Sequence, residues 1–176
     1  MLIKFQDKYP QVSPSAFIAA GVKLIGAVTL GEESSIWFNC VLRADIGQIV
    51  VGDRTNIQDG TVVHLDPDYP CLIGNDVTIG HNAIIHGCVI EDQALISMGA
   101  VVLSGARVGA RSIIGAGAVV LEGQEIPPDS VALGVPAKVR RQVGAEDIER
   151  TRHGVLEYVQ LARLMSSSSE SEDKIC

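Results

Sequence analysis

The stretch Ile90–Ile126, IEDQALISMGAVVLSGARVGARSIIGAGAVVLEGQEI, carries the pattern that determines the architecture of this chain. A branched aliphatic residue occupies every sixth position, and a small or β-branched residue follows most of them four positions later. A sustained period of this kind predicts a parallel β-helix, in which three hexapeptides form one triangular coil and the aliphatic side chains stack inside. The periodic residues are Ile90, Ile96, Val102, Val108, Ile114, Val120 and Ile126.

The same period begins at Val12, so the chain can be divided into three faces by counting hexapeptides. Ten residues separate Val63 from the next periodic residue, Ile73, and the four extra residues predict a loop around 66–70. We name the faces X, Y and Z. The count assigns Leu42, Val63 and Ile85 to face X, Val51 and Ile73 to face Y, and Ile57 and Ile79 to face Z.

Three of the four histidines lie within this count at informative positions. His64 and His86 both follow a periodic residue of face X, one coil apart. Neighbouring strands are about 4.8 Å apart, which lets the two imidazoles converge on one ion. His81 falls on face Z, around a corner, where a second subunit could present it to the same ion. A lone outward histidine is usually a surface residue, but three in this registration predict a metal site.

Polar residues accompany the histidines only in the middle coils. Arg43 falls in the column of His64 and His86, and Asp59 falls below His81. Apolar residues replace them in the coils above and below, so the polar zone is confined as expected for a site. The candidate site residues beside the histidines are Arg43, Asp45, Asn56, Gln58 and Asp59.

Length and composition limit the classes of function. The 176 residues suggest one repeat domain, and the net charge of −7 argues against nucleic acid or an anionic membrane as a partner. No signal-peptide h-region and no run of apolar residues long enough to span a bilayer occurs, so we expect a cytoplasmic protein. The expected boundaries are 1–140 for the β-helix, 141–165 for a C-terminal helix packed on it, and 166–176 for a disordered tail.

Three further expectations concern residues outside the central site. The helix is expected from Ala145 to Met165 because apolar residues recur along one stripe, Ile148, Val155, Val159 and Ala162. The outward aromatic pair Trp37 and Phe38 is expected to pack against a neighbouring subunit. Cys88, close to His86, is a further candidate as a fourth metal ligand or a thiol nucleophile.

Three segments carry a resemblance to a known family. VLRADIG (41–47), GDRTNIQDGTVVH (52–64) and IGHNAIIHGCVI (79–90) resemble the γ-class carbonic anhydrases, and the similarity extends from about Phe5 to Ala162. The resemblance implies a left-handed parallel β-helix that forms a homotrimer, with a zinc ion at each interface. It also implies reversible hydration of CO2 to bicarbonate.

The resemblance also implies roles for individual residues. His64 and His86 would bind the metal from one subunit and His81 from its neighbour, in agreement with the face count. Gln58 would hydrogen-bond the zinc-bound water, and Arg43 would pair with Asp45 across the interface and attract bicarbonate. The remaining pocket residues would be Asn56, Asp59 and, from the C-terminal helix, Tyr158.

The implied chemistry suits these residue types. Three neutral imidazoles leave zinc its full charge and an open position, so that hydroxide forms at neutral pH and attacks CO2. Fe²⁺ and Co²⁺ are alternative metals. The sequence departs from the family pattern in its loop, LDPDYP (65–70), which is short and lacks the acidic shuttle residue; Asp66 and Asp68 are the candidates to replace it.

Two other functions remain open at this stage. Hexapeptide-repeat acyltransferases share the coil and use histidine at subunit interfaces, so acyl transfer or thioester hydrolysis is one alternative. A general-base histidine, however, needs no partners gathered at one ion. The other alternative is a scaffold that keeps the metal for structure and has no catalytic activity.

Overall fold

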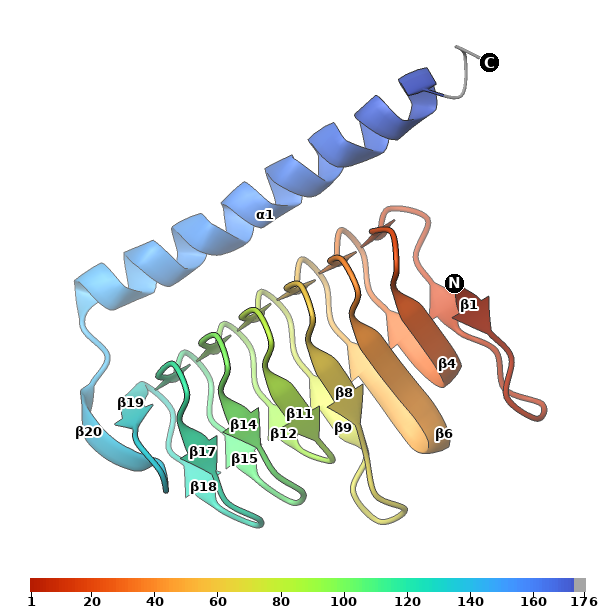
Figure 1. Ribbon diagram of the computed structural model, residues 1–176. Helices are drawn as coiled ribbons and strands as arrows, with labels where there is room; N and C mark the ends of the chain where they lie inside the picture. Colours follow the sequence, from red (N-terminus) through yellow and green to blue (C-terminus); the bar gives the residue numbers. More distant parts are fainter. Residues whose placement is uncertain (173–176) are drawn as a thin grey trace.

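The protein is a β-helix with one long helix alongside it, α1 (Ala145–Glu172), as Figure 1 shows for the computed structural model. The structure describes residues 1–172, with side chains through residue 167. The predicted parallel β-helix with a C-terminal helix is confirmed. Within the described residues, no helix is both long and apolar enough to cross a membrane.

Faces X and Y form one sheet because β4 (Lys23–Leu30) and β6 (Val41–Val51) bend across their shared corner. Between Ala44 and Ile49, β6 contains three more residues than β4 does between Gly26 and Val28, so the register of the two strands shifts there. The other strands of face X are β1 (Leu2–Ile3), β8 (Val62–His64), β11 (Ile84–His86), β14 (Val101–Val102) and β17 (Val119–Val120). Those of face Y are β2 (Gln11–Val12), β9 (Cys71–Ile73), β12 (Val89–Ile90), β15 (Arg107–Val108) and β18 (Glu125–Ile126).

Face Z is a separate sheet that ends in a reversal of chain direction. Its strands are β3 (Phe17–Ile18), β5 (Ser35–Ile36), β7 (Asn56–Ile57), β10 (Thr78–Ile79), β13 (Leu95–Ile96), β16 (Ile113–Ile114), β19 (Ser130–Leu133) and β20 (Lys138–Gln142). The chain thus adds one more coil strand, β19, after the prolines at 127 and 128. β20 then pairs antiparallel to β19 and leads the chain towards α1.

The periodic aliphatic residues form the interior of the prism. Leu42, Val63 and Ile85 of face X are fully buried and stand in register on neighbouring strands. Ile57 and Ile79 of face Z do the same. Because each residue stacks on its equivalent one coil away, a repeat buries apolar surface only with neighbours on both sides. The face assignment made from the sequence is confirmed by this register.

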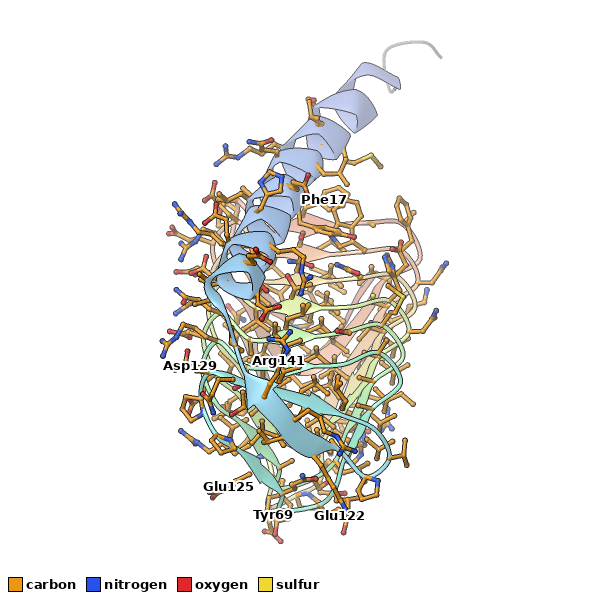
Figure 2. The ribbon with its side chains drawn as sticks, turned by 90° about the vertical axis from the view of Figure 1, so that its left-hand side faces the viewer. Phe17, Tyr69, Glu122, Glu125, Asp129 and Arg141 are labelled. Atoms are coloured by element: carbon orange, nitrogen blue, oxygen red, sulfur yellow. The ribbon has the colours of Figure 1, made fainter. Side chains whose placement is uncertain are left out.

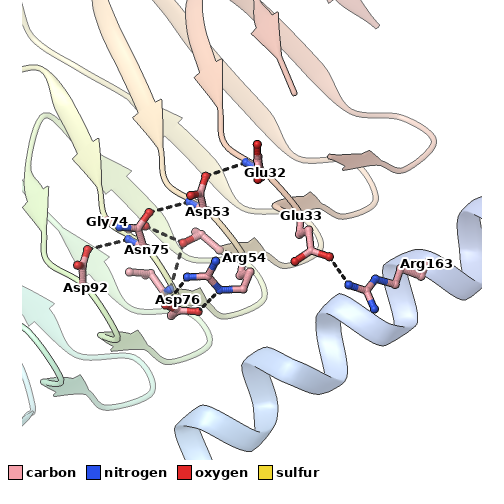
Figure 3. Close-up of polar contacts among 11 residues, drawn as sticks. Glu32, Glu33, Asp53, Arg54, Gly74, Asn75, Asp76, Asp92 and Arg163 are labelled. Carbon is pink, nitrogen blue, oxygen red and sulfur yellow. Dashed lines mark hydrogen bonds and ion pairs between the residues drawn. The ribbon is translucent and has the colours of Figure 1, made fainter. Parts of the chain in front are cut away.

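The corner between faces Y and Z is built from charged and polar residues with a left-handed backbone. Six residues there have φ between 53° and 62°, a conformation that residues other than Gly, Asn and Asp rarely adopt. Arg54 forms two bonds to Asp76, at 2.7 and 2.9 Å, and Arg111 pairs in the same way with Asp129 (Figure 3 shows the first pair). The column reads Glu33, Arg54, Asp76, Gln93, Arg111 and Asp129.

Helix α1 begins at a polar anchor and covers face Z. The carboxylate of Asp147 accepts a hydrogen bond from the backbone N–H of Gly144 at 2.9 Å and pairs with Arg141. These two contacts, that of Arg141 first, hold the pKa of Asp147 well below its usual range. Beyond this anchor the helix contacts β3, β5, β7 and β10. It therefore lies across the same face that carries His81.

The helix also covers an aromatic cluster, which corrects one expectation. Trp37 is only 4% exposed and packs edge-on against Tyr158 of α1, with ring centroids 5.2 Å apart. Phe17, which Figure 2 shows beside the helix, also packs against Trp37, with ring centroids 5.1 Å apart. The prediction that Trp37 packs against a neighbouring subunit is wrong, because the chain's own helix covers it. Phe38 packs beside Trp37 and is half-buried.

The helix differs from its predicted form in the first residue of its apolar stripe and in the position of its C-terminal end. Val155, Val159 and Ala162 are buried as expected, but Ile148 is 42% exposed. The helix also continues seven residues beyond Met165. At the start of this extension the hydroxyl of Ser166 donates back to the carbonyl of Ala162 at 3.0 Å. Residues 173–176 of the predicted disordered tail lie outside the described residues.

We expect Trp37→Ala to lower the free energy of unfolding by about 3 to 5 kcal/mol, because a large buried aromatic side chain is removed between β5 and α1. Denaturant unfolding followed by far-UV circular dichroism measures this change, at fixed protein concentration in case subunits associate. Trp37→Phe keeps an aromatic ring against Tyr158 and serves as the matched control with a smaller loss. An unchanged midpoint for Trp37→Ala would show that α1 docks independently of this cluster.

Candidate metal centre

Two histidines meet on face X. His64 ends β8, His86 ends β11, and the two residues are paired in register. Nδ1 of His64 lies 3.1 Å from Nε2 of His86, and the side chains are 18% and 30% exposed. The predicted convergence of these two imidazoles is therefore present in a single chain. It follows directly from two strands that are neighbours in a parallel ladder.

The outer nitrogens of both rings are held by acceptors. Nε2 of His64 lies 3.0 Å from Oδ1 of Asp45, and a carboxylate can only accept. Nδ1 of His86 lies 2.8 Å from the hydroxyl of Ser104, whose own proton is donated to Oδ2 of Asp66 at 2.6 Å. Both outer nitrogens must then carry the ring proton. In their neutral forms the two imidazoles therefore face each other with lone pairs only.

This arrangement fits a metal cation. Two lone pairs 3.1 Å apart repel unless a proton or a cation lies between them. Tetrahedral Zn²⁺ with Zn–N bonds of about 2.0 to 2.1 Å places two nitrogen ligands about 3.3 to 3.4 Å apart, close to the observed separation. A hydrogen-bond acceptor on the far side of each ligand histidine, usually a carboxylate, a backbone carbonyl or water, is the common support of such sites. Residues His64 and His86 can hold a divalent metal from one side.

Arg43 and Asp45 form the edge of this half-site. Arg43, on β6, pairs with Oδ2 of Asp45, whose other oxygen accepts from His64. Burial alone would raise the pKa of Asp45, but the hydrogen bonds from His64 and Arg43 outweigh it and lower the pKa. Asp45 is therefore a fixed anion that orients His64. Arg43, with a side chain 45% exposed, leaves part of its guanidinium open to solvent.

His81 lies in a second half-site, on face Z. Its Nδ1 is 2.9 Å from Oδ2 of Asp59, the residue one coil below, as predicted from the count. His81 does not join His64 and His86 in the same chain. In the described part of the chain, no group of three or more His, Cys, Asp or Glu side chains is placed to hold a metal. One chain therefore offers a two-histidine half-site on face X and a one-histidine half-site on face Z.

The remaining predicted residues lie with His81 on face Z. Asn56 is fully buried and Gln58 is 8% exposed. The amide of Gln58 donates to Oδ1 of Asn56 at 3.1 Å, and Asn56 donates to the hydroxyl of Thr78 at 2.9 Å. This chain of bonds fixes the amide group of Gln58. Burial first, and then the charges of Asp59 and Glu157, raise the pKa of Tyr158, so the helix brings this ring towards the same half-site.

One predicted alternative is wrong, and one partner was missed. Cys88 is 1% exposed in the core, and hydrogen bonding to Cys71 together with burial raises the pKa of its thiol. It faces away from His86 and cannot act as a ligand or nucleophile there. Ser104 was not among the predicted residues. Its only signal in the sequence is a polar residue close to the histidine column, in the next coil of face X.

Comparison with known proteins identifies the family of this chain. The repeat family described as bacterial transferase hexapeptide (six repeats) matches residues 87–122. A probable carbonic anhydrase of Methanocaldococcus jannaschii is 47% identical over 156 residues, 89% of this chain and 98% of the relative. The mitochondrial γ carbonic anhydrase 2 of Arabidopsis thaliana is 40% identical over 99% of this chain and 65% of the relative. The chain belongs to the γ-class carbonic anhydrase family.

A solved structure adds a second description of the same fold. A Bacillus cereus protein assigned to the acetyltransferases superposes with a TM-score of 0.94 at 44% identity, over 95% of this chain and 97% of that one. A protein described as an acetyltransferase therefore shares the fold of this chain. The fold alone therefore does not distinguish a carbonic anhydrase from an acyltransferase, whereas the residues of the site can.

Proposed function

We propose that this chain is a γ-class carbonic anhydrase that hydrates CO2 reversibly at a metal shared between subunits. The observation that carries the proposal is the pair of inner nitrogens on His64 and His86, which face each other without a proton to share. An acyltransferase histidine acting as general base needs one acceptor nitrogen and no such pair. The family relationship supports the same choice of substrate.

A second subunit would complete the site. We propose a homotrimer in which face X of one chain meets face Z of the next, so that His81 of the neighbour joins His64 and His86. Exposed apolar residues support this contact, because Val62 and Ile84 beside the face X histidines are 42% and 46% exposed and Met98 on face Z is 59% exposed. Such a heterologous contact closes into a ring under threefold symmetry and builds three equal sites.

The residues of the two half-sites would then have complementary tasks. A divalent metal with three neutral imidazole ligands and an open position supplies hydroxide near neutral pH by lowering the pKa of a water molecule. Gln58, fixed by Asn56, would orient that oxygen towards CO2. Met98 would provide apolar surface for the uncharged substrate. Arg43 would attract the bicarbonate product through its open guanidinium.

Imidazole nitrogen suits several metals. Zn²⁺ is the metal we propose, and Fe²⁺ and Co²⁺ bind the same donor type.

The metal-binding prediction follows from the nitrogen pair alone. We expect the protein to bind Zn²⁺, and His64→Ala or His86→Ala to weaken binding by at least about 100-fold, since half of the pair is lost. Competition with a chromophoric chelator measures the dissociation constant.

His153→Ala is the matched control for these two variants. His153 lies on α1, has a side chain that is 69% exposed, and pairs with Glu157 at 3.2 Å and not with any of the three candidate ligands. Its loss should leave the dissociation constant unchanged. Equal weakening in all three variants would mean that zinc is bound non-specifically by surface histidines.

The catalytic prediction concerns the rate and its dependence on buffer. We expect CO2 hydration by the zinc-loaded protein in stopped-flow, and a loss of about 100-fold in kcat/KM for Gln58→Ala, because an oriented hydrogen bond is removed. Asp66 is bonded to Ser104, and Asp68 is exposed and has no ion pair among the described residues, so we expect no internal shuttle in the loop. The rate should therefore rise with the concentration of imidazole buffer.

Gln160→Ala provides the control for Gln58→Ala. Gln160 is exposed on α1, so the same amide is removed without touching the site. A protein that holds zinc at stoichiometric amounts and shows no hydration above buffer would overturn the catalytic proposal and leave the metal-binding scaffold. Acetyl-CoA turnover that survives complete removal of metal would instead favour the acyltransferase reading suggested by the Bacillus cereus structure.

Subunit complementation tests the division of ligands between faces. His64→Ala and His81→Ala each destroy every site in their own homotrimers, but a mixed trimer contains an interface with all three histidines intact. We expect co-refolding of these two variants to restore part of the zinc content. Mixing His64→Ala with His86→Ala should restore none, because those ligands come from one chain. Recovery in the second mixture only would contradict the proposed interface.

A further inference from the structure

Ser104 and Asp66 form a contact to His86 that the family resemblance did not supply. Asp66 belongs to the loop after β8, Ser104 follows β14, and His86 lies between them on β11. The hydroxyl of Ser104 accepts from Nδ1 of His86 at 2.8 Å and donates to Asp66 at 2.6 Å. Asp66 itself is 3.7 Å from Nδ1, too far for a direct hydrogen bond. The serine is therefore the link between the ring and the carboxylate.

The loop is built to hold Asp66 at this place. An antiparallel backbone bridge joins Asp66 and Tyr69, with the N–H of Tyr69 donating to the carbonyl of Asp66 at 3.1 Å. Tyr69 then lies over Gly87 and Gly105: a Cβ at Gly87 would stand 3.0 Å from Tyr69, and one at Gly105 would stand 3.1 Å from its ring. Side chains at those two positions would push the loop away. The glycines let the loop fold back along the prism edge, over the coil that carries Ser104.

The direction of the hydrogen bonds fixes the tautomer of His86. Asp66 can only accept when ionised, so Ser104 must donate to it and accept from His86. The ring proton is thereby held on Nδ1, and the lone pair of Nε2 points towards His64. Asp45 does the same for His64 through its Nε2. The two ligands on face X thus have supports of different kinds, a direct carboxylate for His64 and a serine-linked carboxylate for His86.

We propose that Ser104, with Asp66, is a positioning residue for the metal site, which sets the tautomer and ring orientation of His86 before metal arrives. This inference rests on the proposed function, because it requires His86 to be a ligand. The short loop 65–70 would then support the metal ligand His86 through Asp66. It would not transfer protons. Residues in such outer positions typically change metal affinity about 10- to 100-fold.

The experiment measures zinc affinity, and not activity, in a matched set of variants. We expect Ser104→Ala and Asp66→Ala to raise the zinc dissociation constant about 10- to 100-fold. Ser104→Thr keeps the hydroxyl and should stay within about threefold of the original protein. Asp68→Ala removes the same charge from the same loop, at an exposed residue for which the described chain holds no ion pair, and should have no effect.

Two further readouts separate positioning from general damage to the fold. If Ser104 and Asp66 act as one unit, the double variant should bind zinc no more weakly than the weaker single variant. In the zinc-loaded protein, the Nδ1 proton of His86 should exchange slowly with solvent by NMR, and should exchange rapidly in Ser104→Ala. Equal subunit assembly of all variants, checked by analytical ultracentrifugation, excludes a loss of the interface.

The outcomes distinguish this inference from the proposed function. Failure of the unaltered protein to bind zinc at all would overturn the proposed function and this inference together. Tight binding by the unaltered protein with the same affinity in Ser104→Ala would overturn this inference alone. An effect of Asp68→Ala as large as that of Asp66→Ala would also overturn it, because charge near the site, and not the link through Ser104, would then explain the loss.

Discussion

The register between β8 and β11 is the constraint on which the site depends. Val63 and Ile85 stack in the core, so the residues that follow them, His64 and His86, must point outward side by side. Parallel strands are held about 4.8 Å apart by their hydrogen bonds, and imidazole rings on such neighbours bring their nitrogens within reach of one ion. The apolar ladder inside the prism thus sets the geometry of the polar pair outside it.

This dependence explains which features the sequence predicts well. Periodicity assigns every residue a face and a height, so the pairing of His64 with His86, and of Asp59 with His81, can be counted without coordinates. Contacts made by loops and by the distant helix follow no period. The covering of Trp37 by Tyr158 depends on packing between residues over a hundred positions apart. The contact from Ser104 to Asp66 depends on how a loop of irregular length folds back.

The two groups of histidines differ in how far one chain satisfies their hydrogen bonds. Each chain keeps polar groups partly satisfied within itself, His81 by Asp59 and His64 by Asp45, so neither half-site is left as a set of unpaired buried groups. At the same time, two lone pairs remain on face X that no group in the described chain satisfies. One chain therefore satisfies most of its own polar groups on both faces, but its two inner imidazole nitrogens on face X still face each other.

The charged corner between faces Y and Z has a consequence for how such a protein can change in length. In a repeat protein each coil contacts only its neighbours, so removal of one coil brings the two coils beside it into contact. At the other two corners the positive-φ residues are mostly Gly or Asn, such as Asn82 and Gly99, which carry no charge. At the charged corner Glu33, Arg54 and Asp76 alternate in sign, and loss of the coil between the outer two would stack carboxylate on carboxylate. Gln93 is the one uncharged step between the two Arg–Asp pairs. Gain or loss of a single coil at a charged position of this corner would therefore place like charges side by side. A coil could be gained or lost at Gln93 without this repulsion.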